Sequence, residues 1–340
     1  MLARVAEQIF WMSRYVERAI AVSRLVEVTL HLELDAGEDD QMDLWAPLIG
    51  PAGAEVVTAA SRHDGGGISA AVRHYLAVAP ENPNALVCCI RNARVAARSV
   101  RESISSEMWE QLNMLYLSVA EPRLSEQAED DPYGLYRRIR AGAQFFQGLA
   151  DSTLAHAEDW HFFCLGKYLE RADGVARLLT LRAGLLSGGF GSAAREDETV
   201  RWLAVLRSCG CAEAYARYYS LGVEPARVIE FLLLNPIFPQ SIRFSLNAAW
   251  DSLQAIAAGE APVNANAAVR ALGQLRAMVE HAAVDEVLES GLASYLETVQ
   301  QRICEVADHV TRVYLRDESI QDRPMPAARA AMLMAAQQQQ

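Results

Sequence analysis

Apolar side chains recur three and four positions apart along most of this chain, the spacing that gathers them on one face of an α-helix. The first such stretch covers residues 4–34, and a later one covers 159–186. The longest pattern without glycine or proline, 85–120, predicts one uninterrupted helix, and 263–283 and 284–316 predict the last two. No segment alternates between apolar and polar residues as a half-buried strand would. The pattern therefore predicts an all-α fold, built as a helical bundle.

A short motif near the start of the chain returns in its middle. Tyr-Val-Glu-Arg-Ala at residues 15–19 is followed by Tyr-Leu-Glu-Arg-Ala at residues 168–172, a separation of 170 − 17 = 153 positions. Other matched pairs keep the same order: Ser13 with Gly166, Arg14 with Lys167, Trp45 with Trp202, and Asn82-Pro83 with Asn235-Pro236. We therefore predict two divergent pseudo-repeats, about 1–155 and 156–316, that share one core. They would form a single domain, 1–316, followed by a disordered tail at 317–340.

The charge balance limits the classes of partner that this chain can bind. Its 43 acidic residues outnumber its 31 Lys and Arg residues and give a formal net charge of −12, whereas nucleic-acid-binding domains carry a basic surplus. No uncharged apolar run reaches the roughly 18 residues of a membrane span, and charged residues interrupt the start of the chain, so we expect no signal peptide. The six cysteines match neither a zinc site nor a disulfide framework. These features predict a cytoplasmic protein with reduced thiols that binds neither nucleic acid nor membrane.

A cationic stripe follows one face of the predicted helix 85–120. It consists of Arg91, Arg94, Arg98 and Arg101, at spacings of three, four and three. Like charges at these spacings repel by about 0.2–0.5 kcal/mol per pair, so something must compensate them. One interpretation is that the stripe binds an acidic peptide or an acidic partner surface, because guanidinium groups bind carboxylates well. The other is that carboxylates of the chain itself compensate it. The residues that would extend or neutralise this surface are Trp109, Asn113, Tyr116, Glu17, Glu170, Glu102 and Glu107.

The two Glu-Arg pairs, Glu17-Arg18 and Glu170-Arg171, lie among apolar neighbours and are expected to be partly buried. A pseudo-twofold arrangement would bring Glu17 and Glu170 to equivalent places. Two close carboxylates could bind a metal ion or act as acid and base, with the pKa of one of them raised. The alternative is that both pairs anchor one helix to another, because a buried carboxylate requires a partner.

No recognised catalytic motif occurs in the chain. The Glu-x-x-His spacing that di-iron helix bundles use twice is present once, at Glu158 and His161, and a single copy cannot make that site. No Ser-His-Asp or Cys-His order stands out. We therefore predict no metal site and no cofactor, and we expect no catalytic activity of the chain alone. A homo-oligomerisation module is a further alternative, with the surfaces around Trp45 and Trp202 or the last helix as its contact.

Three separated segments carry a resemblance to the bacterial alpha-E domain family. They are residues 1–19 (MLARVAEQIFWMSRYVERA), 105–113 (SSEMWEQLN) and 235–244 (NPIFPQSIRF). The resemblance implies an all-helical protein that is encoded beside, or fused to, a circularly permuted ATP-grasp amide ligase. It also implies a transglutaminase-like peptidase as a neighbour and a role in ATP-dependent peptide synthesis or tagging. The residues that the family pattern marks are Glu17, Arg18, Arg91, Arg94, Glu107, Trp109, Asn113, Glu170, Arg171, Asn235 and Pro236.

These observations together predict a helical accessory protein that binds an ATP-grasp-type amide ligase. The cationic stripe would bind the ligase or an acidic peptide, with Arg18 and Arg171 as further binding residues. The alternative is an enzyme that acts on peptides or amides through Glu17 and Glu170, with a metal ion assisting.

Overall fold

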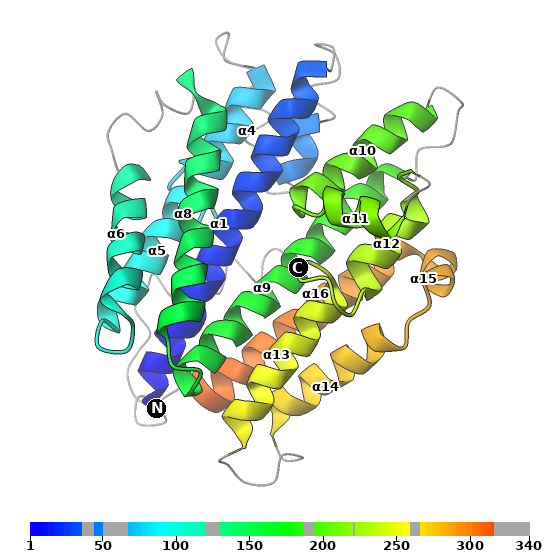
Figure 1. The fold of residues 1–340 in the computed structure, drawn as a ribbon. Helices are drawn as coiled ribbons and strands as arrows, with labels where there is room; N and C mark the ends of the chain where they lie inside the picture. The colour runs from blue at the N-terminus through cyan, green and yellow to red at the C-terminus, as the bar shows by residue number, and fades with distance from the viewer. Residues whose placement is uncertain are drawn as a thin grey trace.

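The computed structural model is all-helical. It describes residues 1–35, 44–49, 67–119, 130–186, 194–219, 222–258 and 266–315. Every regular element within these ranges is a helix, and none of these residues belongs to a strand (Figure 1). The predicted all-α fold class is therefore confirmed. The predicted tail at 317–340 lies outside the described residues.

The described helices follow one another in this order along the chain. Their bounds are α1 Ala3–Asp35, the 3₁₀ turn η2 Ala46–Ile49, α4 Gly67–Ala77, α5 Leu86–Ser99, α6 Ser106–Val119, α8 Pro132–Thr153, α9 Glu158–Leu186, α10 Ala194–Ser208, α11 Ala212–Tyr218, α12 Pro225–Leu234, α13 Ile242–Ala257, α14 Ala267–Glu280, α15 Val284–Ser290, α16 Leu292–Val310 and the π-helical turn η5 Thr311–Leu315. The helices predicted at 4–34 and 159–186 agree with α1 and α9.

The long helices pack as two four-helix rings that meet along α1 and α9 (Figure 1). In the first ring α1 packs against α5 and α8, and α6 contacts both of these helices. In the second ring α9 packs against α13 and α16, and α14 contacts both of these. The rings thus have the same pattern of neighbours. The interpretation of the two halves as duplicated units stays a prediction.

The core continues from one ring into the other. Buried apolar residues of both halves, including Phe10, Phe146 and Leu165, belong to one cluster. Trp45 and Trp202 belong to it as well and are fully buried. The prediction that these two tryptophans provide an apolar contact for a homo-oligomer is therefore wrong, because an enclosed indole offers no surface to a second chain.

The single helix predicted at 85–120 is also wrong. The chain forms α5 and α6, joined by a turn over 100–105 that contains neither glycine nor proline. The turn buries the side chains of Val100 and Ile104. Next to them, the Ser105 hydroxyl accepts a hydrogen bond of 3.1 Å from a backbone N–H in the first turn of α6. Burial and helix capping therefore stabilise a chain reversal that no local helix breaker announces.

The last predicted helix, 284–316, is divided at Gly291. This glycine has a φ of +103°, a backbone conformation that L side chains rarely adopt. It ends α15 and precedes α16, so the break has a visible cause in the sequence. Among the described helices, none is long and apolar enough to cross a membrane.

Candidate functional site

The helices α1 and α9 approach each other closely at Ser13 and Gly166. A Cβ atom on Gly166 would lie 2.3 Å from Ser13 Oγ and 2.4 Å from the carbonyl oxygen of Phe10. Ser13 is fully buried and donates its hydroxyl to the same carbonyl at 2.9 Å. Glycine is therefore required at position 166 for the two backbones to come this near. The Glu-Arg pairs follow one turn later on each helix.

Glu17 on α1 binds Arg171 on α9. The guanidinium donates from Nε to Oε1 at 2.6 Å and from Nη2 to Oε2 at 3.1 Å, and Gln147 of α8 donates to Oε2 at 2.5 Å. The Glu17 and Arg171 side chains are only 5% and 8% exposed. Both oxygens of this buried carboxylate thus accept charge-assisted hydrogen bonds, the stronger class of hydrogen bond.

Glu170 on α9 binds two arginines of α1 in return. Arg14 donates from Nε to Oε2 at 2.8 Å, while Arg18 donates from Nε to Oε1 at 2.5 Å and from Nη2 to Oε2 at 3.0 Å. The Glu170 side chain is 7% exposed. The glutamate of each helix is therefore paired with the arginine of the other. We call Arg14, Glu17, Arg18, Glu170 and Arg171 the crossed Glu-Arg cluster.

Burial and ion pairing act in opposite directions on these carboxyl groups. Burial would raise the pKa of Glu17, but the charge of Arg171 and the hydrogen bonds from Arg171 and Gln147 outweigh it, so this pKa lies below its ordinary value of 4.5. Burial likewise opposes Arg18 and Arg14 at Glu170, and the two cations lower the pKa of Glu170 to about 2. The prediction that one of the two pKa values is raised is wrong. Neither group is poised to donate a proton at neutral pH.

The arginines of the two Glu-Arg pairs also contact the two Asn-Pro turns. Arg18 donates to the side-chain oxygen of Asn84 at 2.5 Å, and Arg171 donates to the carbonyl oxygen of Pro239 at 3.2 Å. In each turn the leading asparagine accepts a hydrogen bond of 3.0 Å from the N–H two residues later. The crossed Glu-Arg cluster thus ties together α1, α9, α8 and both turns, which favours the interpretation of the Glu-Arg pairs as helix anchors.

The stripe arginines lie in the first ring: Arg91, Arg94 and Arg98 are on α5, and Arg101 is in the turn that follows it. Arg94 donates from Nε to the Asn113 side-chain oxygen of α6 at 2.7 Å. Its guanidinium carbon lies 5.5 Å from the Trp109 ring centroid and 4.5 Å from that of Tyr116, and the guanidinium carbon of Arg101 lies 5.0 Å from Trp109. The structure therefore brings these predicted residues together from two antiparallel helices rather than along one. We call Arg91, Arg94, Arg98, Arg101, Trp109, Asn113 and Tyr116 the arginine face.

Three arginines of the arginine face are exposed and have no carboxylate partner among the described residues. Arg91, Arg98 and Arg101 are exposed and form no ion pair with any described residue. Glu17 and Glu170 bind the arginines of the crossed cluster instead, so the interpretation that they neutralise the stripe is wrong. The exposed Glu107, in the first turn of α6, forms no ion pair within the described ranges either. Exposed apolar side chains lie on the same helices: Val95 (58%), Met114 (58%) and Leu117 (54%).

Comparison with known proteins identifies the family. Residues 1–315 match the model of the Alpha-E family, described as a predicted alpha-helical domain with a conserved ER motif. The chain belongs to the Alpha-E family. In this Alpha-E chain the Glu-Arg dipeptide occurs twice, at 17–18 and 170–171, and both copies lie in the crossed Glu-Arg cluster.

The relatives of this Alpha-E chain are longer proteins. It is 26% identical over 264 residues to uncharacterized proteins of Mycobacterium bovis and of two strains of Mycobacterium tuberculosis. The matched stretch makes up 72% of this chain but 28% of each relative. This chain therefore spans little more than a quarter of the length of these relatives. No solved structure matches it.

Sequence reasoning missed several residues that belong to the crossed Glu-Arg cluster or contact it. Arg14 and Arg18 both donate to Glu170, and Gln147 donates to Glu17. The side-chain oxygen of Asn84 accepts a hydrogen bond from Arg18. Arg14 carried a signal, because it lies four residues before Arg18 and therefore on the same face of α1. Gln147 and Asn84 carried none, since only the packing of α8 and of the first Asn-Pro turn places them here.

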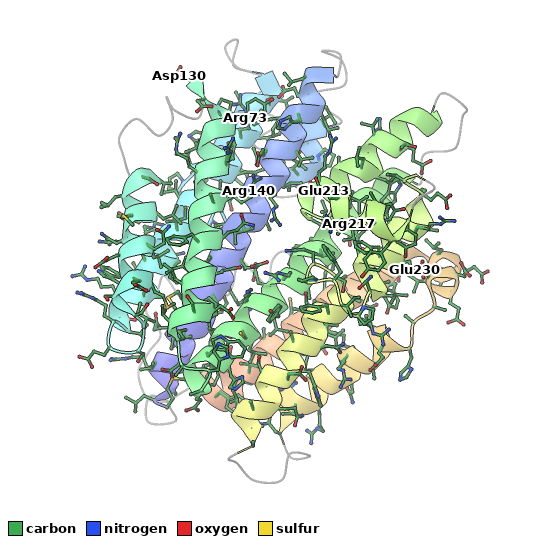
Figure 2. The ribbon with its side chains drawn as sticks, in the orientation of Figure 1. Arg73, Asp130, Arg140, Glu213, Arg217 and Glu230 are labelled. Carbon is green, nitrogen blue, oxygen red and sulfur yellow. The ribbon has the colours of Figure 1, made fainter. Side chains whose placement is uncertain are left out.

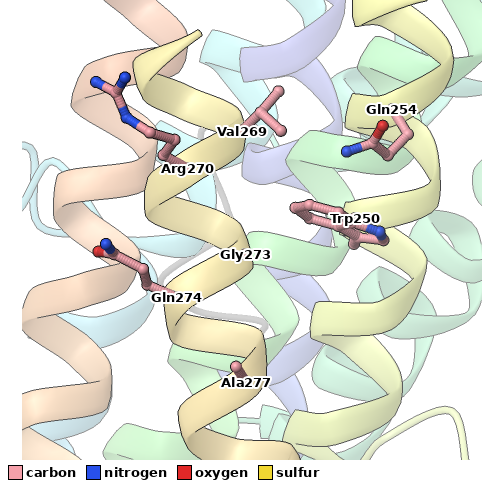
Figure 3. Close-up of a pocket in the computed structure, with 7 residues that line it drawn as sticks. All are labelled: Trp250, Gln254, Val269, Arg270, Gly273, Gln274 and Ala277. Carbon is pink, nitrogen blue, oxygen red and sulfur yellow. The ribbon is translucent and has the colours of Figure 1, made fainter. Parts of the chain in front are cut away.

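Other polar features of the chain lie apart from both groups. Arg140 of α8, labelled in Figure 2, forms an ion pair with Glu27 of α1. An open recess of about 470 Å³ lies between α13 and α14, where the Trp250 ring packs over Gly273 (Figure 3). Among the described residues, no group of three His, Cys, Asp or Glu side chains gathers as metal ligands would.

Proposed function

We propose that this Alpha-E protein is a helical binding partner of an ATP-grasp-type amide ligase in a system that synthesises or attaches peptides. In this proposal it acts in the cytoplasm without catalytic activity of its own, and a transglutaminase-like peptidase is a further partner. The observation that carries the proposal is the arginine face. It exposes three guanidinium groups that form no ion pair with any described residue, on a chain whose formal net charge is −12.

The chemistry of the arginine face fits an acidic protein surface or an acidic peptide. Arg98 forms no ion pair with any described residue, and Arg91 donates only to Cys88 Sγ, at 3.4 Å, within the described part of the chain. Both guanidinium groups can therefore bind a carboxylate in a bidentate manner, while Arg94 is held in place by Asn113 and the two aromatic rings. Buried arginine and aromatic side chains are the residues that contribute most to protein interfaces. The exposed apolar residues of α5 and α6 add area that a partner would bury.

The crossed Glu-Arg cluster supports the non-catalytic part of the proposal. Each of its carboxylates is neutralised by arginine and has a lowered pKa, so neither is a ready acid, base or metal ligand. The length of the mycobacterial relatives is consistent with an Alpha-E unit that works beside other domains. We also propose one domain over 1–316 that arose by duplication, since Ser13 meets Gly166 at the crossing of α1 and α9 and the glutamate of each motif binds the arginine of the other.

Charge reversal on the arginine face tests this function. The double variant Arg91→Glu with Arg98→Glu is expected to weaken binding of the ATP-grasp-type ligase by about tenfold or more, because facing like charges cost several kcal/mol. Titration calorimetry of the purified proteins would measure this. The matched control is Arg302→Glu with Arg312→Glu on α16 and η5, which changes the net charge equally at two exposed sites. Equal affinity of both double variants and the wild type would contradict the proposal.

A further inference from the structure

Lys167 is the only lysine of this chain. The other 30 of its 31 Lys and Arg residues are arginine. A guanidinium stays protonated at any pH that a protein experiences, whereas a lysine amine can lose its proton and become a nucleophile. Arginine serves every other cationic position here. The exception at position 167 therefore points to a role that requires an amine.

The corresponding position of the first Glu-Arg motif holds Arg14, and the two side chains behave differently. Arg14 is buried and donates from Nε to Glu170 at 2.8 Å. Lys167 forms no hydrogen bond or ion pair with any described residue. At the ion-paired position 14 the chain has arginine, and at position 167, which forms no ion pair with any described residue, it has lysine.

The surroundings of Lys167 hold its side chain while leaving the amine reachable. Its Nζ lies 5.2 Å from the ring centroid of Tyr168, and the guanidinium carbon of Arg171 lies 5.2 Å from the same ring. Lys167 as a whole is half-buried. Its Nζ has no hydrogen-bond partner among the described residues, but it is not completely enclosed. The amine therefore keeps contact with solvent, the side from which a small electrophile would approach.

Burial and the nearby Arg171 favour the neutral form of the Lys167 amine. Burial lowers the pKa of the amine, and the positive charge of Arg171 lowers it further. Glu17 on α1, Cys164 on α9 and Asp151 on α8 act in the opposite direction without cancelling this. A neutral amine is the form that attacks carbonyl carbon, so more of the Lys167 population is nucleophilic than in a free lysine.

We propose that Lys167 is an acyl acceptor, whose amine attacks the carbonyl carbon of an acyl phosphate and becomes an amide. This deepens the proposed function, on which it rests, because an ATP-dependent amide ligase can supply a carboxylate activated in this way. The new bond joins Nζ to the carbonyl carbon, and the bond between that carbon and the phosphate oxygen breaks. The neutral amine gives up one proton, which leaves with the phosphate as hydrogen phosphate. No electron transfer is involved.

A small acyl phosphate tests the amine without any ligase. The full chain is incubated with acetyl phosphate at pH 7.5, and acetylation of Lys167 is followed by intact-mass measurement and peptide mapping. We expect Lys167 to react severalfold faster than the side-chain amine of a blocked free lysine in the same solution, because a larger fraction of its amine is neutral. A rate equal to or below that of the free amine would overturn the proposal.

A transplanted lysine provides the matched control. The double variant Arg14→Lys with Lys167→Arg keeps the number of cations and moves the single lysine to the ion-paired position. Its amine would be held protonated by Glu170, so we expect its acetylation to be at least about tenfold slower than that of Lys167. Equal rates at the two positions would show that the site has no special reactivity and would overturn the proposal.

The ligase reaction then separates this inference from the proposed function. With the ATP-grasp-type ligase, ATP and an acidic peptide, we expect a peptide adduct on Lys167 of the wild type and none on Lys167→Arg, which keeps the positive charge. Ligase that binds both chains but modifies neither would overturn the inference and leave the partner role intact. Ligase that fails to bind the wild type would overturn the proposed function, while the acetyl phosphate rates still decide about Lys167.

Discussion

Replacing Glu17 with glutamine is expected to lower the free energy of unfolding by about 3 to 5 kcal/mol, the cost of leaving a buried charge without its partner. Arg171 is 8% exposed, and Glu17 is the only carboxylate paired with it among the described residues. Because the pKa of Glu17 lies below 4.5 in the folded protein, its ion pair stabilises the fold fully above pH 4.5. This contribution is lost as the pH falls below that value. Denaturant titrations of wild type and Glu17→Gln should therefore converge in the acidic range.

A double-mutant cycle identifies the cause of this loss. Glu17→Gln combined with Arg171→Met should cost less than the sum of the single variants, by about 0.5 to 3 kcal/mol. The control is Glu224→Gln, which breaks the 2.9 Å pair of Glu224 with Arg227 at a more exposed site. It should cost less than about 1 kcal/mol. Additive losses in the cycle, or a Glu17→Gln loss no larger than the control, would contradict the account of the crossed cluster.

The second large effect is expected at Gly166. In an unconstrained helix, alanine stabilises relative to glycine by about 1 kcal/mol. At this crossing, however, the added Cβ would lie 2.4 Å from a backbone carbonyl oxygen that cannot rotate away. We therefore expect Gly166→Ala to lower the free energy of unfolding by about 3 kcal/mol, the upper part of the range for overpacked cores. Thermal and denaturant unfolding would measure it.

Gly174 on the same helix provides the control for this prediction. Apart from its chain neighbours and the backbone of its own helix, no atom lies within 4 Å of the position that its Cβ would take. Gly174→Ala should therefore be neutral or stabilise the protein by up to about 1 kcal/mol. The two variants are expected to change stability differently, because only the alanine at position 166 would push α9 away from α1. A Gly166→Ala protein as stable as Gly174→Ala would refute the close approach of these helices.

Much of the fold was predictable because most helices are long and amphipathic. The bounds of α1 and α9 follow from their apolar spacing, and Gly291 marks the break between α15 and α16 in the sequence itself. The break between α5 and α6 was not predictable in the same way. Residues 100–105 contain no glycine or proline, and what stabilises their reversal is the burial of Val100 and Ile104 in the finished core.

The candidate site was predictable where the sequence repeats. The repeated Glu-Arg motif pointed to Glu17 and Glu170 and to their role as helix anchors, but it could not say which arginine each would bind. That depends on how α1 crosses α9, which the close contact at Gly166 determines. Because the sequence does not show how α1 crosses α9, it left open that Glu17 and Glu170 neutralise the stripe arginines. In the fold both glutamates instead bind arginines of the crossed Glu-Arg cluster.

Native-level purification of the tagged wild-type protein from its own cells tests the partner role most directly. The measurement is the molar ratio of co-purifying proteins by mass spectrometry, compared with Arg91→Glu/Arg98→Glu and with Arg302→Glu/Arg312→Glu. We predict that an ATP-grasp-type ligase is recovered at a fixed ratio with the wild type and the control variant, and is lost from the arginine-face variant. Recovery of the wild-type chain without a ligase, or equal recovery of the ligase with all three proteins, would contradict the account.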